Sequence, residues 1–365
     1  MSQTTVAASS RPGTEDELAG MIRAAKGPVW VRGGGTRIVP PAGLEVLDTG
    51  GLSGIVLYEP AALTLVVRAG TPLAEVEALL AAENQRLPFE PGGAPGSTMG
   101  GVAATNACGP RRFQAGACRD ALIGVRFVDG RGTVVKNGGR VMKNVTGYDL
   151  VKLLAGSHGT LGVLTELAFK LQPVPPAAAT VILPGLSAKA AGAALRAAMS
   201  SPYDVTGAGW MPGTGALIRV EGLAESVDYR CGRLAVALAP HGAAVVERDP
   251  ARVTALWRDL RAAAPLAGGT GAPWRISVRP SDGPEVVERL GGEAVMDWGG
   301  GLVTALYPEG ADARARLTDL PGHATLVRGT GAARFHPEPA PVAALSAALR
   351  AQFDPRGILN PGLMG

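Results

Sequence analysis

Apolar residues in the first part of the chain fall into short runs of strand length and into amphipathic runs of helical period. Pro28–Val31 and Leu63–Ala69 are expected to be strands, and residues 14–26 are expected to form a helix. A second helix is predicted to begin at Pro72, with Thr71 as its capping residue, because apolar residues then recur at helical spacing. The pattern therefore predicts mixed helices and strands from the start.

A hairpin and a long strand follow. Ala121–Val128 and Thr133–Val135 are apolar runs on either side of Asp129–Gly132, and this turn sequence favours a β-hairpin. From Val163 to Leu171, apolar residues or Thr165 occupy every second position, which predicts a strand with one buried face.

A cluster of prolines at 173–176 separates this region from a second one with different patterning. Strands are expected at 180–183, 216–221, 243–248, 275–279, 302–307 and 325–328, and helices at 187–199, 226–238, 251–263 and 284–290. Such alternation fits an α+β cap domain, with an antiparallel sheet and helices on one face. We expect a first domain over residues 1–175, a cap or substrate domain over 176–335, and a segment over 336–365 whose helix, near 342–352, packs back on the first domain.

Three glycine-rich segments lie within the first domain. The first, Val31–Arg37, is an apolar strand that runs into Gly33, Gly34 and Gly35 and then Thr36. Glycine lets backbone amides approach a phosphate or a flat ring closely, because no Cβ intervenes and positive φ costs nothing. Alone, this run could equally be a flexible turn, and its spacing does not match the dinucleotide-binding pattern G-x-G-x-x-G.

The second segment, Pro91–Gly109, contains prolines that restrict the loop and Ser97 or Thr98 as possible helix caps. Its glycines at 100 and 101 leave the surface of the expected helix bare. The third segment, Gly156–Thr165, leads into the long strand. Together the three segments predict a backbone cradle for a large phosphorylated ligand.

These segments resemble the flavin-binding domain shared by vanillyl-alcohol oxidase and p-cresol methylhydroxylase. The run from Pro91 to Pro175, with Arg111-Arg112-Phe113 and Lys143–Leu150, is similar to the FAD-binding subunit of glycolate oxidase, and Phe353–Gly362 is similar to the tail of related 2-hydroxyacid dehydrogenases. The resemblance implies a two-subdomain FAD-binding domain and non-covalent FAD. The residues it assigns to the cofactor are Gly33, Gly34, Gly35, Thr36, Pro95, Gly96, Ser97, Gly100, Gly101, Thr105, Gly159, Gly162 and Val163.

Composition narrows the function classes. The net charge of +4 is spread over scattered arginines, with few aromatics, and this argues against nucleic-acid binding. No apolar run is long enough to span a bilayer, and residues 1–5 do not read as a secretion signal, so we expect a cytoplasmic protein that meets a membrane only through a partner subunit. Three cysteines, Cys108, Cys118 and Cys231, form no cluster-binding pattern, and no metal site is predicted.

The catalytic residues are not fixed by the sequence. Oxidation of a hydroxy acid needs a group that binds its carboxylate and a group that takes the hydroxyl proton. Arg279, Arg334 and His336 are candidates for these roles. For Arg275 and Arg279 the solvated face of an edge strand is favoured over substrate binding, and His158, in the third glycine segment, fits a peripheral position better than a catalytic one.

Three hypotheses for function remain open. In the favoured one, the chain is the FAD-binding subunit of a glycolate or other 2-hydroxyacid dehydrogenase or oxidase complex. It would then pass electrons to a second flavoprotein and an iron–sulfur subunit, because it has no second redox centre of its own. The alternatives are a standalone FAD-dependent 2-hydroxyacid dehydrogenase and a non-catalytic flavin-binding assembly subunit.

Overall fold

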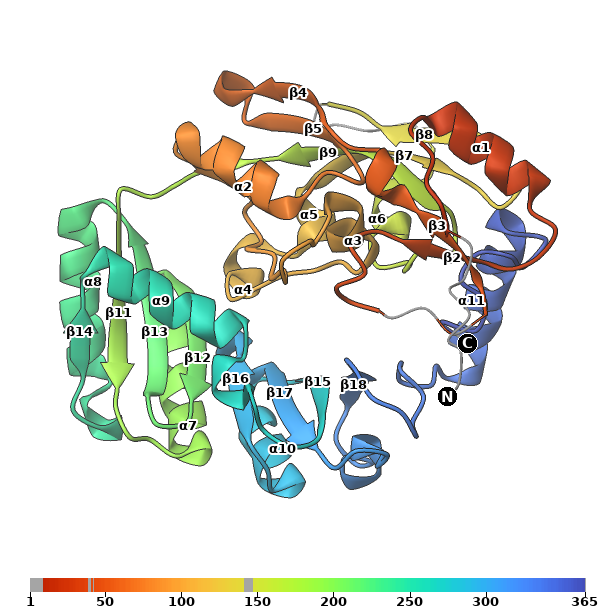
Figure 1. The fold of residues 1–365 in the computed structure, drawn as a ribbon. Coiled ribbons are helices and arrows are strands. Elements are labelled where there is room, and N and C mark those ends of the chain that lie inside the picture. The colour runs from red at the N-terminus through yellow and green to blue at the C-terminus, as the bar shows by residue number, and fades with distance from the viewer. Residues whose placement is uncertain (1–8, 39–40, 42, 141–146, 365) are drawn as a thin grey trace. The chain divides into compact units, whose positions relative to one another are not determined.

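The computed structural model describes residues 9–38, 41, 43–140 and 147–364, which divide into two compact units (Figure 1). Unit 1 contains the chain up to Cys108, Gly116–Val174 and the C-terminal part from Pro337. Unit 2 contains Pro175–His336 and the short segment Gly109–Ala115, which the sequence did not single out. The predictions on residues 1–5 and 143–146 lie outside the described residues. The division at 175 and 335 is kept as our proposal for the domains.

Unit 1 begins with a small parallel sheet and a helix. Its strand order is β1 (Ser9–Ser10), β3 (Glu45–Asp48) and β2 (Val29–Arg32), and α1 (Glu15–Ala24) connects β1 to β2. The Thr14 side chain caps α1 by accepting a hydrogen bond from the N–H of Glu17. Leu18, Ala19 and Ile22 of α1 pack against both the sheet and Ile358 and Leu359 of the C-terminal tail.

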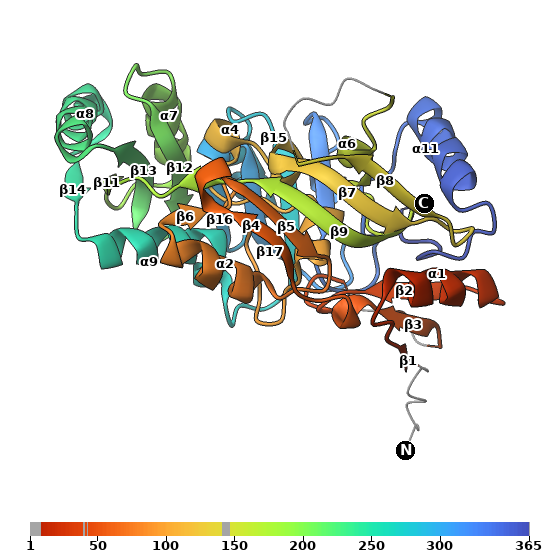
Figure 2. The same ribbon diagram turned by 90° about the horizontal axis from the view of Figure 1, so that it is seen from above.

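A five-stranded antiparallel sheet forms the second part of unit 1 (Figure 2). Its order is β4 (Ile55–Glu59), β5 (Thr64–Arg68), β9 (Val163–Lys170), β7 (Leu122–Val128) and β8 (Val134–Gly138). The predicted hairpin is present between β7 and β8. In its turn, Asp129 Oδ1 accepts hydrogen bonds from the N–H groups of Arg131 and Thr133. Short strands β6 (Gln85–Arg86) and β10 (Gln172–Pro173) pair separately.

Helices α2 (Leu73–Ala82), α3 (Met99–Ala104), α5 (Cys118–Ala121) and α6 (Leu150–Leu154) connect these strands. The prediction that Thr71 caps α2 is wrong, because Pro72 is the capping residue and makes no side-chain cap. The Thr71 hydroxyl instead bonds the backbone N–H and C=O of Gly54, at 2.9 and 3.2 Å. A tertiary contact has therefore replaced the local one.

The C-terminal segment returns to unit 1, as predicted. After α11 (Ala340–Phe353), Leu359 pairs in parallel with Val29 of β2, and the Val29 N–H donates to Ile358 C=O at 2.8 Å. The Arg356 guanidinium donates to carbonyl groups of α1 and of the β7–β8 turn. The tail thus adds a further chain segment beside β2.

Unit 2 is built on an eight-stranded antiparallel sheet. The strand order is β14 (Val245–Glu247), β11 (Ala177–Leu183), β13 (Gly215–Gly222), β12 (Val205–Met211), β16 (Ala294–Asp297), β17 (Leu302–Tyr307), β15 (Ala272–Val278) and β18 (Gly322–Leu326). Strands β12 and β16 were not expected from the sequence. Strand β15 lies between β17 and β18, so the interpretation of Arg275 and Arg279 as parts of an edge strand is wrong.

Helices cover both faces of this sheet, where one face was predicted. Helices α7 (Ala188–Met199), α8 (Ala224–Ala237) and α10 (Gly283–Leu290) pack on one face. Helix α9 (Pro250–Arg261) packs on the opposite face of the β11–β13 and β16 region, and Figure 2 shows it across the sheet from α7 and α8. Alternate residues of β13 serve the two layers: Ile218 contacts the first core and Leu217 the second. The class is nevertheless α+β, as expected.

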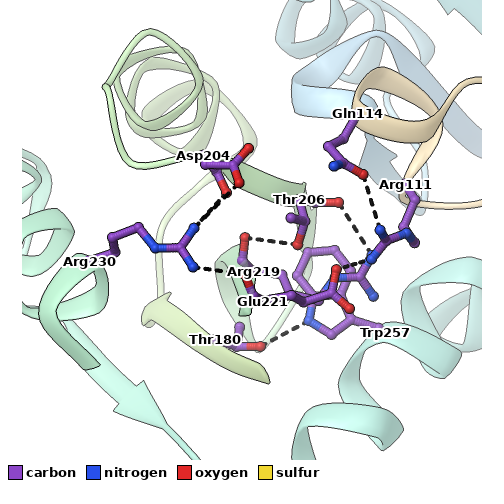
Figure 3. Close-up of polar contacts among 9 residues, drawn as sticks. All are labelled: Arg111, Gln114, Thr180, Asp204, Thr206, Arg219, Glu221, Arg230 and Trp257. Carbon is purple, nitrogen blue, oxygen red and sulfur yellow. Dashed lines mark hydrogen bonds and ion pairs between the residues drawn. The ribbon is translucent and has the colours of Figure 1, made fainter. Parts of the chain in front are cut away.

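The segment Gly109–Ala115, which includes α4 (Arg112–Ala115), is held in unit 2 by buried polar contacts (Figure 3). The Arg111 guanidinium forms an ion pair with Glu221 of β13 and donates to Gln114 Oε1 at 3.1 Å. Arg219 lies 3.8 Å from the same carboxylate and stacks on Trp257 of α9. The Trp257 indole N–H donates to Thr180 Oγ1 at 2.9 Å.

Within the described ranges, no helix is long and apolar enough to cross a membrane.

Candidate cofactor-binding site

The first glycine segment packs directly against the second. A Cβ on Gly33 would lie 2.4 Å from Thr98 Oγ1, and a Cβ on Gly34 would lie 1.7 Å from the carbonyl oxygen of Gly96. Neither contact is possible for a real side chain, so the close approach of the two loops requires glycine. Side-chain contacts hold the same loops together: Thr36 Oγ1 and Ser97 Oγ are 3.1 Å apart, and Arg37 donates to the Gly92 carbonyl at 2.5 Å.

Helix α3 presents a bare surface to this region. Thr98 caps the helix, as predicted for Ser97 or Thr98, by accepting from the Gly101 N–H at 3.3 Å. A Cβ on Gly100 would lie 2.8 Å from the Ala69 carbonyl oxygen, so glycine lets α3 pack against the end of β5. Thr105 closes the helix by donating to the Gly101 carbonyl at 2.7 Å.

The third segment is fixed from the C-terminal tail. Gly159 adopts φ +73°, and a Cβ there would lie 2.8 Å from Asn360 Nδ2. That amide group donates to the His158 carbonyl at 2.8 Å, while Asn360 Oδ1 accepts from the Val31 N–H at 2.7 Å. The side chain of Asn360, which is 3% exposed, therefore joins the first and third glycine segments.

The three segments enclose one pocket of about 720 Å³, part of which is open to solvent. Of the residues predicted for the cofactor, those that line it are Gly33, Gly34, Gly35, Thr36, Gly100, Gly101, Thr105, Gly159 and Gly162. Gly96 and Ser97 contact the first loop at Gly34 and Thr36, Pro95 precedes them in the chain, and Val163 is buried in the core of unit 1. These four do not line the pocket.

A second recess shares the first glycine loop with this pocket. It is bordered by Gly33, Gly34, Gly35 and Thr98, together with Arg11 and Arg32. Arg32 pairs with Asp48 at 2.7 Å and is one-third exposed. Because Asp48 also lines the recess and offsets the charge of Arg32, the loop amides and Arg11 are the groups that suit an anionic group at this position.

Sequence reasoning missed several residues of the pocket, among them Trp30, Thr98, Asn360 and Leu363. The tail motif Phe353–Gly362 was noticed, but nothing local indicated that Asn360 reaches β2. His158 lines the pocket with φ +51°. Its backbone N–H donates to Ala104 C=O at 2.8 Å, so the backbone of this residue helps to fix the loop against α3.

The Cys118 thiol of unit 1 holds its proton firmly. Burial raises the pKa of Cys118 strongly, and the neighbouring Cys108 raises it further. Cys118 is fully buried and Cys108 is 9% exposed. In unit 2, burial raises the pKa of Cys231 to about 11.

The weak catalytic candidates all lie in unit 2. Arg334 is half-buried and donates to the Leu326 and Val327 carbonyls, at 3.1 and 2.6 Å, and burial lowers its pKa. His336 Nδ1 accepts from the Ala324 N–H at 3.4 Å. Arg279 is exposed and lies 3.8 Å from Asp282. Arg334 and His336 thus hold the edge of the sheet near β18, whereas Arg279 pairs at the end of β15.

Comparisons with known proteins agree with this geometry. Residues 6–138 match the family model described as an FAD binding domain. The chain is 34% identical over 344 residues to glycolate oxidase subunit GlcE of Escherichia coli, an alignment that covers 93% of each protein. The chain belongs to the GlcE family. FAD is therefore its cofactor.

Other relatives extend this result. The chain is 33% identical over 159 residues to glycolate oxidase subunit GlcD of Bacillus subtilis, covering 42% of the chain and 34% of that protein. A solved alkyldihydroxyacetonephosphate synthase superposes on 99% of the chain and 78% of its own length, with a TM-score of 0.73 and 18% identity. That structure supports the fold alone, which is the two-part fold of p-cresol-methylhydroxylase-type flavoproteins that the sequence predicted.

Proposed function

We propose that this member of the GlcE family is the FAD-binding subunit of a glycolate oxidase complex, which oxidises a small 2-hydroxyacid and passes the electrons to partner subunits. The observation that supports this most is the identity to the Escherichia coli subunit along 93% of both chains, since it includes unit 2 as well as the FAD-binding domain. The relatives that share only the FAD-binding region carry less weight.

The residues of the pocket fit FAD. A Cβ at Gly33, Gly34 or Gly159 would collide with a neighbouring loop or with Asn360, so these positions keep the backbone accessible where the ligand must approach. We assign the pyrophosphate to the amides of Gly33–Gly35, with Thr36 beside them, and the flavin end to the bare surface of α3 at Gly100 and Gly101. Arg11 adds positive charge at the adjoining recess.

Bound FAD supplies the capacity to accept two electrons from a hydroxy acid. This chain supplies the pocket that orients the cofactor: the amides of the first loop bind, Asn360 fixes the loops, and the apolar Trp30, Leu164 and Leu363 exclude water. We propose that FAD is bound non-covalently, because the first loop contains no histidine and the buried Cys118 keeps its proton.

The partners follow from the relatives and from the redox chemistry. A GlcD-type flavoprotein is proposed as one partner, since GlcD of Bacillus subtilis shares the FAD-binding region. An iron–sulfur subunit is proposed as the electron acceptor, because the cysteines of this chain do not have a cluster-binding pattern. We propose a cytoplasmic complex that meets a membrane only through such a subunit.

The test is purification of the chain from its host with whatever binds to it, followed by an absorption spectrum and a glycolate-dependent dye reduction assay. The proposal expects a flavin spectrum, dye reduction by the complex, and none by the separated chain. Dye reduction by the chain alone would instead establish a standalone dehydrogenase. A colourless protein that takes up no added FAD would refute the cofactor assignment.

A further inference from the structure

One part of the sheet in unit 2 has a polar face that no helix of unit 2 covers. On β15, Trp274 and Ile276 point into the core beside α10, so Arg275 points to the other face. Its direct cross-strand neighbours are Thr304 of β17 and Thr325 of β18. Helix α9 covers this face only over the neighbouring strands, where Leu217 and Val295 meet it.

The same face continues with further polar residues toward the end of β15. Ser277 is paired with His323 of β18, and both lie two residues along their strands from Arg275 and Thr325. Leu302 of β17 is paired with Ser277, and Asp297 of β16 is paired with Leu302, so both belong to the same row. The face is therefore lined by a guanidinium, an imidazole, three hydroxyl groups, one leucine and one carboxylate. A sheet face of this composition is not suited to packing an apolar layer, but it offers hydrogen-bond donors.

Trp298 stands beside this face in an unfavourable backbone conformation. It follows directly after β16 and has φ +55°, which is uncommon for a bulky side chain. Two hydrogen bonds fix it: its N–H donates to Asp297 Oδ1 at 2.7 Å, and its indole N–H donates to the Gly109 carbonyl at 3.0 Å. Residues kept in such conformations cluster at ligand-binding sites.

Two arginines converge on that indole. The Cζ atom of Arg112 lies 4.7 Å and the Cζ atom of Arg275 lies 5.9 Å from the centre of the Trp298 ring. Within the part of the chain that the structure describes, no carboxylate forms an ion pair with Arg275. Positive charge also surrounds His323, whose pKa is lowered by burial and then by His336 and Arg112.

We propose that this face, bounded by Arg112, Arg275, Trp298 and His323, binds the carboxylate group of a small organic acid. A guanidinium presents paired N–H donors that match the two oxygens of a carboxylate, and two guanidinium groups beside an aromatic ring give a partly desolvated anion site. Thr304 and Thr325 add hydroxyls for a second polar group, such as the hydroxyl of glycolate. The claim that the bound anion is the substrate's carboxylate rests on the proposed function. The claim that this face binds an anion does not depend on that function.

The experiment is a histidine NMR titration of the full-length protein, with its bound flavin as purified. The chain has four histidines, so the His323 signal can be assigned with a His323→Gln variant. Added glycolate is expected to raise the pKa of His323, because a bound anion offsets the neighbouring positive charges. Glycolamide, the neutral analogue, and sodium chloride at the same ionic strength are expected to leave it unchanged. An unchanged pKa with glycolate, or an equal rise with sodium chloride, overturns the proposal.

Matched arginine variants test the residues. Arg275→Gln is expected to weaken glycolate binding by about tenfold or more, because a charge-assisted contact is lost. Arg252→Gln is the control, since the Arg252 side chain on α9 is 77% exposed and pairs with Glu247 at 2.9 Å. It should change binding by less than about twofold. Should Arg275→Gln fail to fold, Arg275→Lys is used instead, because it keeps the charge without the paired donors and should still weaken binding. Equal glycolate affinity in the wild type, the Arg275 variant and the control variant refutes the site.

The flavin spectrum separates this proposal from the previous one. A protein that contains flavin but shows no glycolate effect at His323 retains the proposed function and loses the anion site. A colourless protein that still shows the effect loses the FAD assignment and retains the anion site.

Discussion

The side chain of Asn360 accepts a hydrogen bond from the backbone N–H of Val31, 329 positions earlier in the chain, at 2.7 Å. The same side chain donates to the carbonyl of His158. Two glycine loops that form the walls of the proposed FAD pocket are thus fixed by one residue of the tail. This relationship places the C-terminal residues within the cofactor site.

Replacement of Asn360 by alanine should weaken both folding and FAD binding. The partly buried N–H of Val31 and carbonyl of His158 would lose their partners, which corresponds to a loss of about 1–3 kcal/mol in the free energy of unfolding. Urea unfolding and flavin fluorescence titration measure the two effects. Asn84→Ala is a matched control, because Asn84 has a similar φ of +51° but is exposed. Equal losses of stability in both variants would mean that backbone strain at position 360 matters, and not the two hydrogen bonds of the Asn360 side chain.

Gly34→Ala should abolish the close contact of the first two loops. The new Cβ would lie 1.7 Å from the Gly96 carbonyl oxygen, which backbone movement alone can relieve. We expect a destabilisation of about 1–3 kcal/mol and a protein that purifies with little flavin. The ratio of visible flavin absorption to protein absorption measures this. Gly27→Ala serves as the control, since nothing lies within 4 Å of a Cβ there, and its flavin content should stay unchanged.

Glu221→Gln should destabilise unit 2 and release the Gly109–Ala115 segment. The side chains of Arg111 and Glu221 are only 4% and 6% exposed. Removal of the negative charge leaves the buried guanidinium groups without a counter-charge, which should lower the free energy of unfolding by about 3–5 kcal/mol. Hydrogen exchange of residues 109–115, together with urea unfolding, reports both effects. Asp228→Asn breaks the exposed pair with Arg248 and should cost less than about 1 kcal/mol. Similar costs for the two variants would contradict this account of the buried pair.

Glu15 should make the stability of unit 1 depend on acid pH. Burial by itself raises the pKa of Glu15, but hydrogen bonds from Arg126 and Thr165 and the charge of Arg126 outweigh burial, so the pKa lies below the ordinary value of 4.5. The stabilisation is therefore complete above about pH 4.5 and is lost as pH falls through the lower, folded-state pKa. The difference in unfolding free energy between the wild type and Glu15→Gln should shrink over that range. A difference that does not depend on pH, or an equal trend in the exposed Asp16→Asn, would argue against it.

The sequence predicted the elements whose signals are local. The glycine segments, the hairpin at Asp129–Gly132 and the Thr98 cap depend on residues that are neighbours in the chain. Strand β12 was missed because Gly207 and Gly209 do not favour strands. In the structure, a Cβ at either position would lie within 2.8 Å of Trp257 or Leu260 of α9, so the glycines serve helix packing. This contact also explains why a second helical layer was not foreseen.

The site was predictable where the backbone does the binding, and not where distant side chains meet. Asn360, Trp30 and Thr98 reach the pocket through contacts between segments far apart in the chain. Arg112 and Arg275 come together at Trp298 because α4 belongs to unit 2, although its flanking residues belong to unit 1. The spacing of residues along the chain does not indicate that a segment flanked by unit 1 belongs to unit 2.

Because the segment Gly109–Ala115 belongs to unit 2 but is flanked by unit 1, it also constrains the order in which the two units can fold during translation. Arg111 is translated 110 positions before Glu221, and unit 1 still lacks the segment from Pro337 when the last strand of unit 2 is finished. Neither unit can therefore complete its fold while the ribosome is still translating the strands of unit 2. A fragment limited to residues 175–336 would contain the buried carboxylate of Glu221 but would lack its guanidinium partner, Arg111.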